Sequence, residues 1–320
     1  MNSILLVNFG GPRSLAEVES FLAELLCDRD VVRTWFPKFV HNWFFGRVAK
    51  KRAKKVAHDY EAIGGKSPIY FDTELLAQKL GSQVLTFHRY LPATHQSSLE
   101  ALENSSAEEI RVLPLFPQFC YATTGSIARF FTERLSIKAL SKLRWIQSYA
   151  GHEGFVSSYQ HRIRTFLQAQ NIAEKEVVLL FSAHGVPQSF INEGDIYKSE
   201  CELSFQKVMQ AFPNALGHLC YQSKFGRGEW LRPYTNEACE EILSWNQERK
   251  HVVVVPISFT SDHIETLFEI EELYLPVIRA NRLNAHRCPA LNLEPQWIQA
   301  LGEILQSKKL CFTEQLVRPR

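Results

Sequence analysis

The sequence lacks a long apolar run, and this absence excludes membrane-spanning proteins from the expected classes. Its hydrophobic stretches all fall well short of the about 20 consecutive apolar residues that a membrane-spanning helix needs. The apolar residues 4–7 follow Met1 almost at once, without the basic stretch that opens a secretory signal. We therefore expect a cytoplasmic protein, with peripheral contact at the inner face of the membrane left open.

The sequence also lacks a cysteine framework and an excess of either charge. Its 7 cysteines are scattered, odd in number and without a CxxC pair, so neither a disulfide scaffold nor a zinc ribbon is expected. The 36 basic and 34 acidic residues leave a net charge of +2, which provides no global field for nucleic acid or for a strongly acidic partner. Any basic function must come from a local cluster.

What is present is enough apolar sequence for two cores, since the 320 residues are 45% hydrophobic. Short apolar runs that end in small or turn residues occupy 4–9, 110–115, 177–181 and 252–256. Such continuous Val, Ile and Leu runs are typical of strands buried on both faces of a parallel sheet. Amphipathic stretches that predict helices lie between them, for example at 15–26, 73–85 and 159–170. The alternation indicates an α/β class with open parallel sheets.

The two halves of the chain repeat one pattern. The first opens with a strand that ends in Gly10-Gly11-Pro12, and the second with one that ends in His184-Gly185-Val186-Pro187. A later strand, proline and polar turn recur at 114–124 and at 256–263. We therefore predict two similar lobes with a boundary near 148–155. Active sites of open α/β sheets lie beyond the carboxyl ends of the strands, which directs attention to these four turns.

His184 follows a predicted buried strand directly and precedes Gly185. A turn histidine whose ring bonds only to the backbone would explain the position without any function. A histidine at a strand end can equally act as a general base near neutral pH or as a metal ligand. The residues alone leave both interpretations open.

Residues 259–272 form a second candidate, because Asp262, Glu265, Glu269 and Glu272 share one face of a predicted helix. An acidic face at a helix start is favoured by the helix dipole and needs no function. The dipole does not account for repulsion that continues to Glu272. A row of hard oxygen ligands would serve as a path for a divalent cation.

Residues 35–55 combine aromatic and basic side chains. Six aromatic residues lie within 35–45, and Arg47, Lys50, Lys51, Arg52, Lys54 and Lys55 follow. One interpretation is a helical hairpin with a core-facing aromatic stripe and a solvated basic end. The other is a surface that rests on an anionic bilayer or holds a flat apolar ligand. Nucleic-acid binding is not expected, because the charge is too local and the fold pattern is wrong for the usual modules.

Several of these segments together resemble the ferrochelatase family, whose members insert Fe²⁺ into a porphyrin in the last stage of haem synthesis. The matching segments, in order, are 5–12, 60–69, 115–126, 181–195, 221–224 with 230–231, and 253–267. The Ser182-Ala183-His184 strand end and the block Phe259–Thr266 are the most specific in combination. The resemblance covers nearly the whole chain.

The resemblance implies a chelatase-like fold of two Rossmann-like lobes, residues 1–150 and 151–305, with a porphyrin cleft between them. It also implies a mobile lip within 30–60 and a C-terminal tail, 306–320, that returns to the first lobe. A lip that touches the membrane would suit a hydrophobic substrate and product.

The resemblance also implies roles for single residues. His184 corresponds to the histidine beside the pyrrole nitrogens, which takes pyrrole protons or binds iron, and Glu265 to the carboxylate that faces it. Pairing the two residues across the internal repeat predicts that they lie on facing lobes. These two are the expected metal contacts. The expected catalytic set is His184, Glu265, Asp262, His263 and Glu269. The expected substrate-binding residues are Phe9, Phe116, Tyr121, Ser126, Ser223, Trp230 and Phe259.

Some positions depart from the family pattern. The usual acidic residue one turn beyond Glu269 falls on Leu273, with Glu272 beside it. Propionate contacts are left to Arg29, Lys66, Arg89 or Ser126. Some members hold a [2Fe–2S] cluster, but its internal cysteine falls on Tyr121 and its C-terminal trio is reduced to Cys311. We expect no cluster.

The expected activity is insertion of Fe²⁺, a substrate, into protoporphyrin IX. The aromatic-rich lip favours this apolar porphyrin over coproporphyrin III, the first alternative. The sequence block at 259–266 argues against the alternative of a cobalt or nickel chelatase. From a different class, a non-catalytic porphyrin or metal carrier stays open. Peripheral membrane contact through Trp35–Lys55 is a further expectation, and no nucleic-acid partner is expected.

Overall fold

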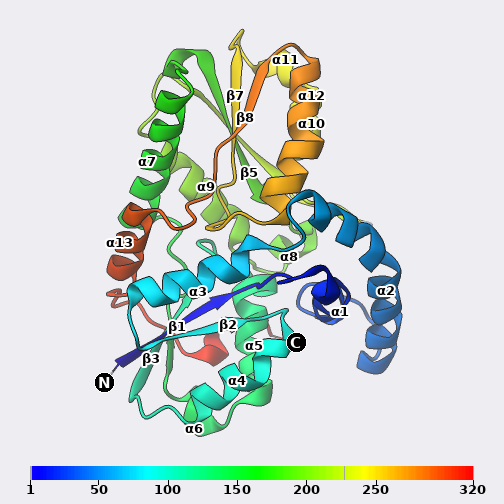
Figure 1. Cartoon of the computed structure of the whole chain (residues 1–320), viewed down its shortest axis with the longest axis vertical. Helices are drawn as coiled ribbons and strands as arrows, with labels where there is room; N and C mark the ends of the chain where they lie inside the picture. The colour runs from blue at the N-terminus through cyan, green and yellow to red at the C-terminus, as the bar shows by residue number, and fades with distance from the viewer. Residues whose placement is uncertain (1, 227, 320) are drawn as a thin grey trace. The chain divides into compact units, whose positions relative to one another are not determined.

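The computed structural model describes residues 2–226 and 228–319, and its chain divides into two units (Figure 1). The first unit comprises Met1–Ser148 and Gly302–Arg320, and the second comprises Tyr149–Leu301. Each unit contains a 4-stranded sheet in which every pairing is parallel. The prediction of an α/β class with parallel sheets is therefore confirmed.

The first sheet has the order β2-β1-β3-β4. Its strands are β1 (Asn2–Asn8), β2 (Val84–His88), β3 (Glu109–Pro114) and β4 (Leu143–Trp145). Leu5, Leu6 and Val7 of the inner strand β1 are all fully buried, because side chains on both faces of an inner parallel strand are covered by helices. This burial explains the continuous apolar run at the start of the sequence.

The helices of the first unit lie between its strands in the sequence. They are α1 (Val18–Cys27), α2 (Lys38–Ala62), α3 (Pro68–Leu80), α4 (Pro92–Glu103), α5 (Ser126–Arg134) and α6 (Ile137–Leu140). Shorter turns are η1 (Leu15–Glu17), the π-helical η2 (Tyr121–Gly125) and η5 (Thr313–Leu316). The chain end belongs here, since Cys311 pairs with Trp145 in an antiparallel bridge and Leu316 is buried in the core.

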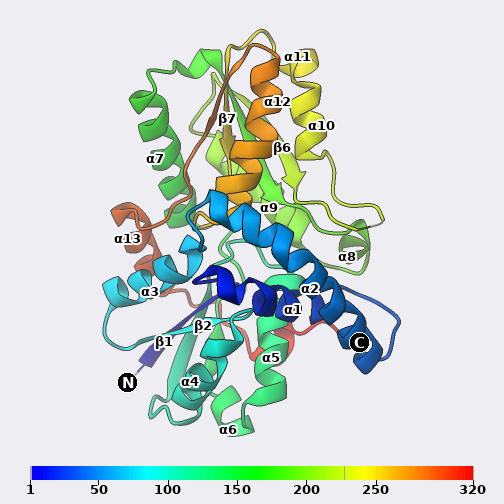
Figure 2. The same cartoon turned by 45° about the vertical axis from the view of Figure 1, so that its right-hand side comes forward.

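The second sheet repeats this architecture in the order β6-β5-β7-β8. Its strands are β5 (Val177–His184), β6 (Leu216–Gln222), β7 (His251–Val255) and β8 (Asn284–Arg287). Successive residues of β5 face opposite sides. Leu180 joins a core with residues of α10 (Thr235–Glu240) and α12 (Leu275–Ala280), while Phe181 packs on Phe205 of α9 (Tyr197–Met209). Both faces are therefore covered, with α7 (Glu153–Ala169) on one side and α10 and α12 on the other (Figures 1 and 2).

The helices of the second unit include one long π-helical element. They are α7 (Glu153–Ala169), α8 (Gln188–Asn192), α9 (Tyr197–Met209), α10 (Thr235–Glu240), α11 (Ile242–Trp245), η4 (Glu265–Tyr274), α12 (Leu275–Ala280) and α13 (Pro295–Ile304). A short 3₁₀ turn, η3 (Glu174–Glu176), precedes β5. The π-helical segment η4 carries Glu265 and Glu269 and is the element that matters most for the site.

The predicted helix over 73–85 is wrong at both ends. Helix α3 begins at Pro68 and ends at Leu80, before Gly81. Gly81 has a φ of 136°, a backbone conformation that favours glycine and ends the helix. The chain then enters β2 at Val84, so residues 84–85 belong to a strand.

The helical hairpin with a core-facing aromatic stripe is also wrong. Residues 38–62 form the single helix α2, which packs against α1 (Figure 2). Trp35, Phe39 and Trp43 are 87%, 75% and 59% exposed. The segment is therefore an aromatic surface followed by a basic one.

None of the helices within 2–226 and 228–319 has both the length and the apolar character required to cross a bilayer.

Candidate active site

The carboxyl edge of the second sheet holds the predicted histidine. His184 is the last residue of β5 and is paired in register with Gln222, the last residue of β6. Two hydrogen bonds fix its backbone: the His184 amide donates to Ser258 Oγ, and the Tyr197 hydroxyl donates to the His184 carbonyl, both at 2.9 Å. The loop after β7 is tied to α7, since Tyr159 Oη lies 2.7 Å from the carbonyl of Pro256. The histidine is thus held by a rigid strand end.

The His184 ring faces Glu265. Its Nδ1 lies 2.5 Å from the Gly185 carbonyl, which can only accept, so Nδ1 carries a proton. Its Nε2 lies 3.6 Å from Glu265 Oε1, and the two side chains are 33% and 26% exposed. The prediction that Glu265 faces His184 from another lobe is wrong, because both residues belong to the second unit. Strands β5 and β7 are neighbours, so the segments that follow them meet at one edge.

Glu265 lies between two imidazoles. Its Oε2 is 3.4 Å from Nε2 of His263, whose Nδ1 lies 3.1 Å from the Ser261 carbonyl. Burial acts to raise the pKa of Glu265, but His184 and His263 outweigh it and hold that pKa well below its usual range. Burial acts to lower the pKa of His184, but Glu265 and then Glu269 outweigh it and raise the pKa to about 9. The free protein therefore holds an imidazolium–carboxylate pair at neutral pH.

Glu269 is a second carboxylate beside this pair. Its Oε2 accepts hydrogen bonds from Gln222 Nε2 at 2.8 Å and from Ser223 Oγ at 2.5 Å. Ser223 has a φ of 63°, a left-handed conformation that favours glycine, so its hydroxyl is held at the cost of backbone strain. Burial and the charge of Glu265 raise the pKa of Glu269. Of the two carboxylates, Glu269 is the one closer to accepting a proton.

The predicted row of carboxylates does not exist. Asp262 is buried before the helix, and its Oδ1 accepts from Thr266 Oγ1 and Arg287 Nη1, each at 2.8 Å. Its Oδ2 accepts from Asn292 Nδ2, also at 2.8 Å. The expected α-helix is the π-helical η4, whose wider turns bring Glu269 near Glu265 but leave Glu272 exposed. Asp262 anchors the loop to β8, and the row is reduced to Glu265 and Glu269.

The substrate-binding residues predicted in the first unit have protein partners of their own. Phe9 packs on Tyr90 with ring centroids 4.4 Å apart, and Phe116 and Tyr121 are partly buried against the core. Ser126 is buried, donates a short hydrogen bond to Asp28, and accepts from Arg89 Nε at 3.0 Å. The Ser126 hydroxyl therefore already makes its hydrogen bonds within the protein.

The residues predicted in the second unit divide differently. Phe259 joins the site, since its ring centroid lies 4.6 Å from that of His263 and 6.4 Å from that of His184. Ser223 supports Glu269, as described above. Trp230 is buried and packs on Phe225 at 5.1 Å. Of the predicted substrate-binding residues in the second unit, Phe259 is thus the one with ring contacts to the site histidines.

Sequence reasoning missed the side chains that support the site. Gln222 and Ser182 lie in segments that carry the family resemblance, but the sequence assigns no role to either, nor to Ser258 or Tyr197. Ser182 carries a usable signal, because a hydroxyl inside the apolar run of β5 must find a partner. Ser182 Oγ donates to Gln222 Oε1 at 2.7 Å.

The described residues, 2–226 and 228–319, contain no group of three or more His, Cys, Asp and Glu side chains arranged to hold a metal ion. All seven cysteines are free thiols. The expected absence of a [2Fe–2S] cluster stays a prediction.

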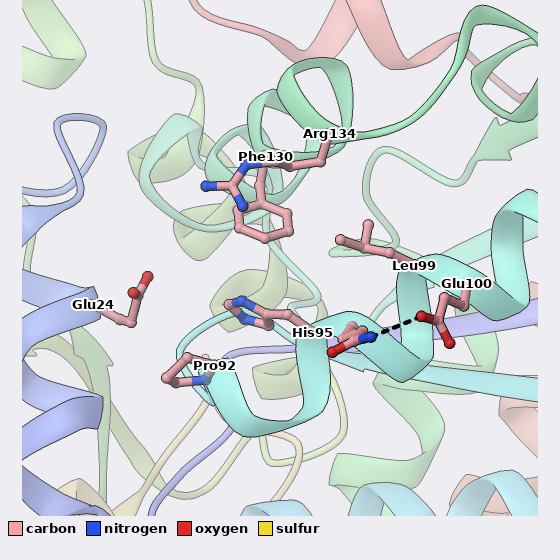
Figure 3. A pocket seen from close by; sticks show the side chains of 8 residues that line it. Glu24, Pro92, His95, Leu99, Glu100, Phe130 and Arg134 are labelled. Carbon is pink, nitrogen blue, oxygen red and sulfur yellow. Dashed lines mark hydrogen bonds between the residues drawn. The ribbon is translucent and has the colours of Figure 1, made fainter.

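A cavity of about 440 Å³ lies in the first unit and is lined by side chains of α1, α4 and α5 (Figure 3). In Figure 3, His95 and Phe130 lie between Glu24 on one side and Leu99 and Glu100 on the other. None of the predicted site residues lines it. The cavity is therefore separate from the candidate site.

Comparison with known proteins places the chain in one family. The family model described as ferrochelatase matches residues 1–309. Ferrochelatase of Chlamydia caviae is 46% identical over 99% of both chains, and that of Chlamydia felis is 44% identical over 98% of both.

Solved structures support the fold alone. CbiX, the terminal enzyme of siroheme biosynthesis in denitrifying bacteria, superposes with a TM-score of 0.52 at 13% identity, covering 96% of this chain and 99% of its own. SirB from Bacillus subtilis with Fe³⁺ gives 0.53 at 14% identity, covering 95% and 96%. The matches over nearly the whole sequence show that the chain belongs to the ferrochelatase family.

Proposed function

We propose that this ferrochelatase-family lyase inserts Fe²⁺ into protoporphyrin IX, yielding protohaem and two protons. The observation that carries the proposal is the His184–Glu265 pair at the carboxyl edge of the second sheet, with 3.6 Å between Nε2 and Oε1 and both side chains partly exposed. An imidazole and a carboxylate are the groups that metallation requires, because the ring must lose two N–H protons while a divalent cation is delivered.

In this proposal Glu265 receives the metal ion. Its low pKa keeps it ionised, and oxygen ligands bind Fe²⁺ without the strong hold of a thiolate. The cation compensates the charge that keeps His184 protonated, so the pKa of His184 falls and its Nε2 becomes free to accept a pyrrole proton. Binding of the metal and activation of the base are thereby coupled.

Glu269, Asp262 and His263 complete the site. Glu269 has a raised pKa and lies beside Glu265, so it is the group that receives protons as His184 releases them. His263 bonds to Glu265, and Asp262 holds the loop before η4 through Arg287. We assign proton transfer to Glu269 and positioning of Glu265 to the other two.

The preference for protoporphyrin rests on the segment Trp35–Lys55. Its exposed aromatic residues, followed by the basic ones, favour an apolar substrate and peripheral contact with an anionic bilayer. Flotation of the purified protein with anionic and with zwitterionic liposomes tests the contact. Binding to neither would remove this part of the proposal.

The activity is tested by anaerobic incubation with Fe²⁺ and either protoporphyrin IX or coproporphyrin III, followed by absorbance. Metallation of protoporphyrin is the expected result, preference for coproporphyrin would replace the substrate, and no metalloporphyrin would refute the function. The variant His184→Ala separates an enzyme from a carrier, because only an enzyme loses metallation while it retains porphyrin binding. The spectrum of the protein alone should show no cluster bands.

A further inference from the structure

A chain of buried polar side chains lies behind the candidate site. Gln222 is 2% exposed, and Ser182 and Thr235 are fully buried. Ser182 Oγ donates to Gln222 Oε1 at 2.7 Å and lies 2.9 Å from Thr235 Oγ1. The oxygen of the Gln222 amide is therefore already occupied by Ser182.

The nitrogen of the same amide contacts two turns of η4 at once. Gln222 Nε2 donates to the backbone carbonyl of Glu265 at 2.9 Å and to Glu269 Oε2 at 2.8 Å. Both partners can only accept, so only one orientation of the amide satisfies all its neighbours. Ser182 holds the amide in that orientation.

We propose that Gln222 is a positioning residue, whose carboxamide fixes the Glu269 carboxylate relative to the backbone that carries Glu265 and thereby sets how readily the site takes up Fe²⁺. The proposal rests on the function proposed for Glu265. A neutral amide suits this place, since a third carboxylate would repel the other two and an apolar side chain would leave Glu269 with Ser223 as its remaining donor among the hydrogen bonds described above. Residues that orient metal-binding side chains typically change metal affinity or activity about 10–100-fold when they are lost.

Two variants test the amide and the group that orients it. Gln222→Met keeps the length of the side chain and removes both of its hydrogen-bonding functions. Ser182→Ala leaves the amide intact but allows it to turn, so we expect the same change with a smaller size. Because Ser182→Ala removes only one oxygen atom, it is the smaller change to the fold. If Gln222→Met fails to fold, the KM of Ser182→Ala for Fe²⁺ tests the role of the amide by itself.

The readout is a comparison of two Michaelis constants, measured anaerobically with the full chain. We expect Gln222→Met to raise the KM for Fe²⁺ about tenfold and to leave the KM for porphyrin unchanged. Gln188→Met is the matched control, because Gln188 is a half-buried residue of α8 whose side chain donates to Asn192 of the same helix, in a hydrogen bond that includes no residue of the site. Thermal unfolding of each variant shows that it is folded.

An unchanged KM for Fe²⁺ in folded Gln222→Met and Ser182→Ala would overturn the proposal, as would an equal rise in both Michaelis constants. Glu265→Gln is measured in the same assay. If Glu265→Gln metallates porphyrin at the normal rate, the function proposed for Glu265 fails. If Glu265→Gln is inactive and Gln222→Met is unaffected, only the role of Gln222 fails.

Discussion

Each unit holds a polar cluster that includes residues from the segments after its strands, yet the two clusters differ in kind. In the first unit, Asp28 is buried and accepts from Arg89 Nη2 and from the Tyr90 hydroxyl, each at 2.9 Å, and from Ser126. In the second unit, Glu265 lies between the imidazoles of His184 and His263 in a partly exposed site, and Glu269 is a second carboxylate beside it.

The difference teaches which cluster is structural and which is chemical. The Asp28 carboxylate has its hydrogen-bonding capacity and its charge satisfied by one guanidinium and two hydroxyls. Binding of a proton or a metal ion there is therefore not favoured. Glu265 and Glu269 lie close together, and their pKa values shift in opposite directions: His184 and His263 lower that of Glu265, while burial and the charge of Glu265 raise that of Glu269. Opposed pKa shifts in a partly open site mark groups suited to exchange protons and cations.

The largest effect is expected from removal of a reactive group in the second unit. Glu265→Gln preserves the shape of the side chain but removes the charge that would receive Fe²⁺. We expect kcat for metallation to fall about 10²–10⁴-fold, and His184→Ala to give a loss of similar size. Anaerobic absorbance assays measure both. A Glu265→Gln variant with more than half of the normal rate would remove the distinction between the clusters.

The next effect is on stability and belongs to the first unit. Asp28→Ala leaves the buried Arg89 guanidinium without its main carboxylate and leaves two hydroxyls without their acceptor. We expect the free energy of unfolding to fall by about 3–5 kcal/mol. Urea unfolding measures it, with Asp28→Asn as the control that keeps an acceptor oxygen and should lose less. A loss below about 1 kcal/mol would show that this cluster is not structural.

The two units also differ in the pKa shifts of one histidine each, which predict opposite effects of pH on stability. His184 has its pKa raised from 6.5 to about 9, so its pairing stabilises the fold fully below pH 6.5 and is lost as pH rises through 9. Burial lowers the pKa of His95 in the first unit to about 4, so its contribution is present above pH 6.5 and is lost as pH falls through 4. NMR titration of the ring protons measures both midpoints.

In Glu265→Gln the midpoint of His184 should fall below 9, because burial then acts without the largest opposing charge. His95 should titrate unchanged in the same variant. A His184 midpoint that stays near 9 would show that Glu265 is not the source of the shift.

The inner strands could be predicted from the sequence, and the outer ones could not. Val252–Val255 in β7 is apolar throughout because helices cover both of its faces. The outer strand β6, Leu216–Gln222, includes Gly217 and His218, and nothing in its pattern separates it from a loop.

The site shows the same limit. His184 and Glu265 could be located because each follows an apolar run, but their contact depends on the order of the strands, which the pattern does not contain. Asp262 could not be recognised as an anchor, because its partner Arg287 lies 25 residues away. The π-helical geometry of η4 is equally invisible to a search for α-helical spacing.

The smallest effect on the fold is expected at the aromatic surface before and within α2, which has no counterpart in the described second unit. Trp35, Phe39 and Trp43 are more than half exposed, so their truncation removes little buried area. Trp43→Ala should change the free energy of unfolding by no more than about 0.5 kcal/mol. It should nevertheless reduce flotation with anionic liposomes, because exposed Trp side chains insert at the bilayer interface.

Ile137 is 86% exposed in α6, away from the aromatic segment in the sequence, so Ile137→Ala is the matched control and should float like the unaltered protein. Equal flotation of the two variants would show that exposure alone, and not the aromatic and basic composition of Trp35–Lys55, governs contact with lipid. Reduced flotation of Trp43→Ala with an unchanged unfolding curve would assign the surface to binding. It would then stand apart both from the closed cluster around Asp28 and from the reactive one around Glu265.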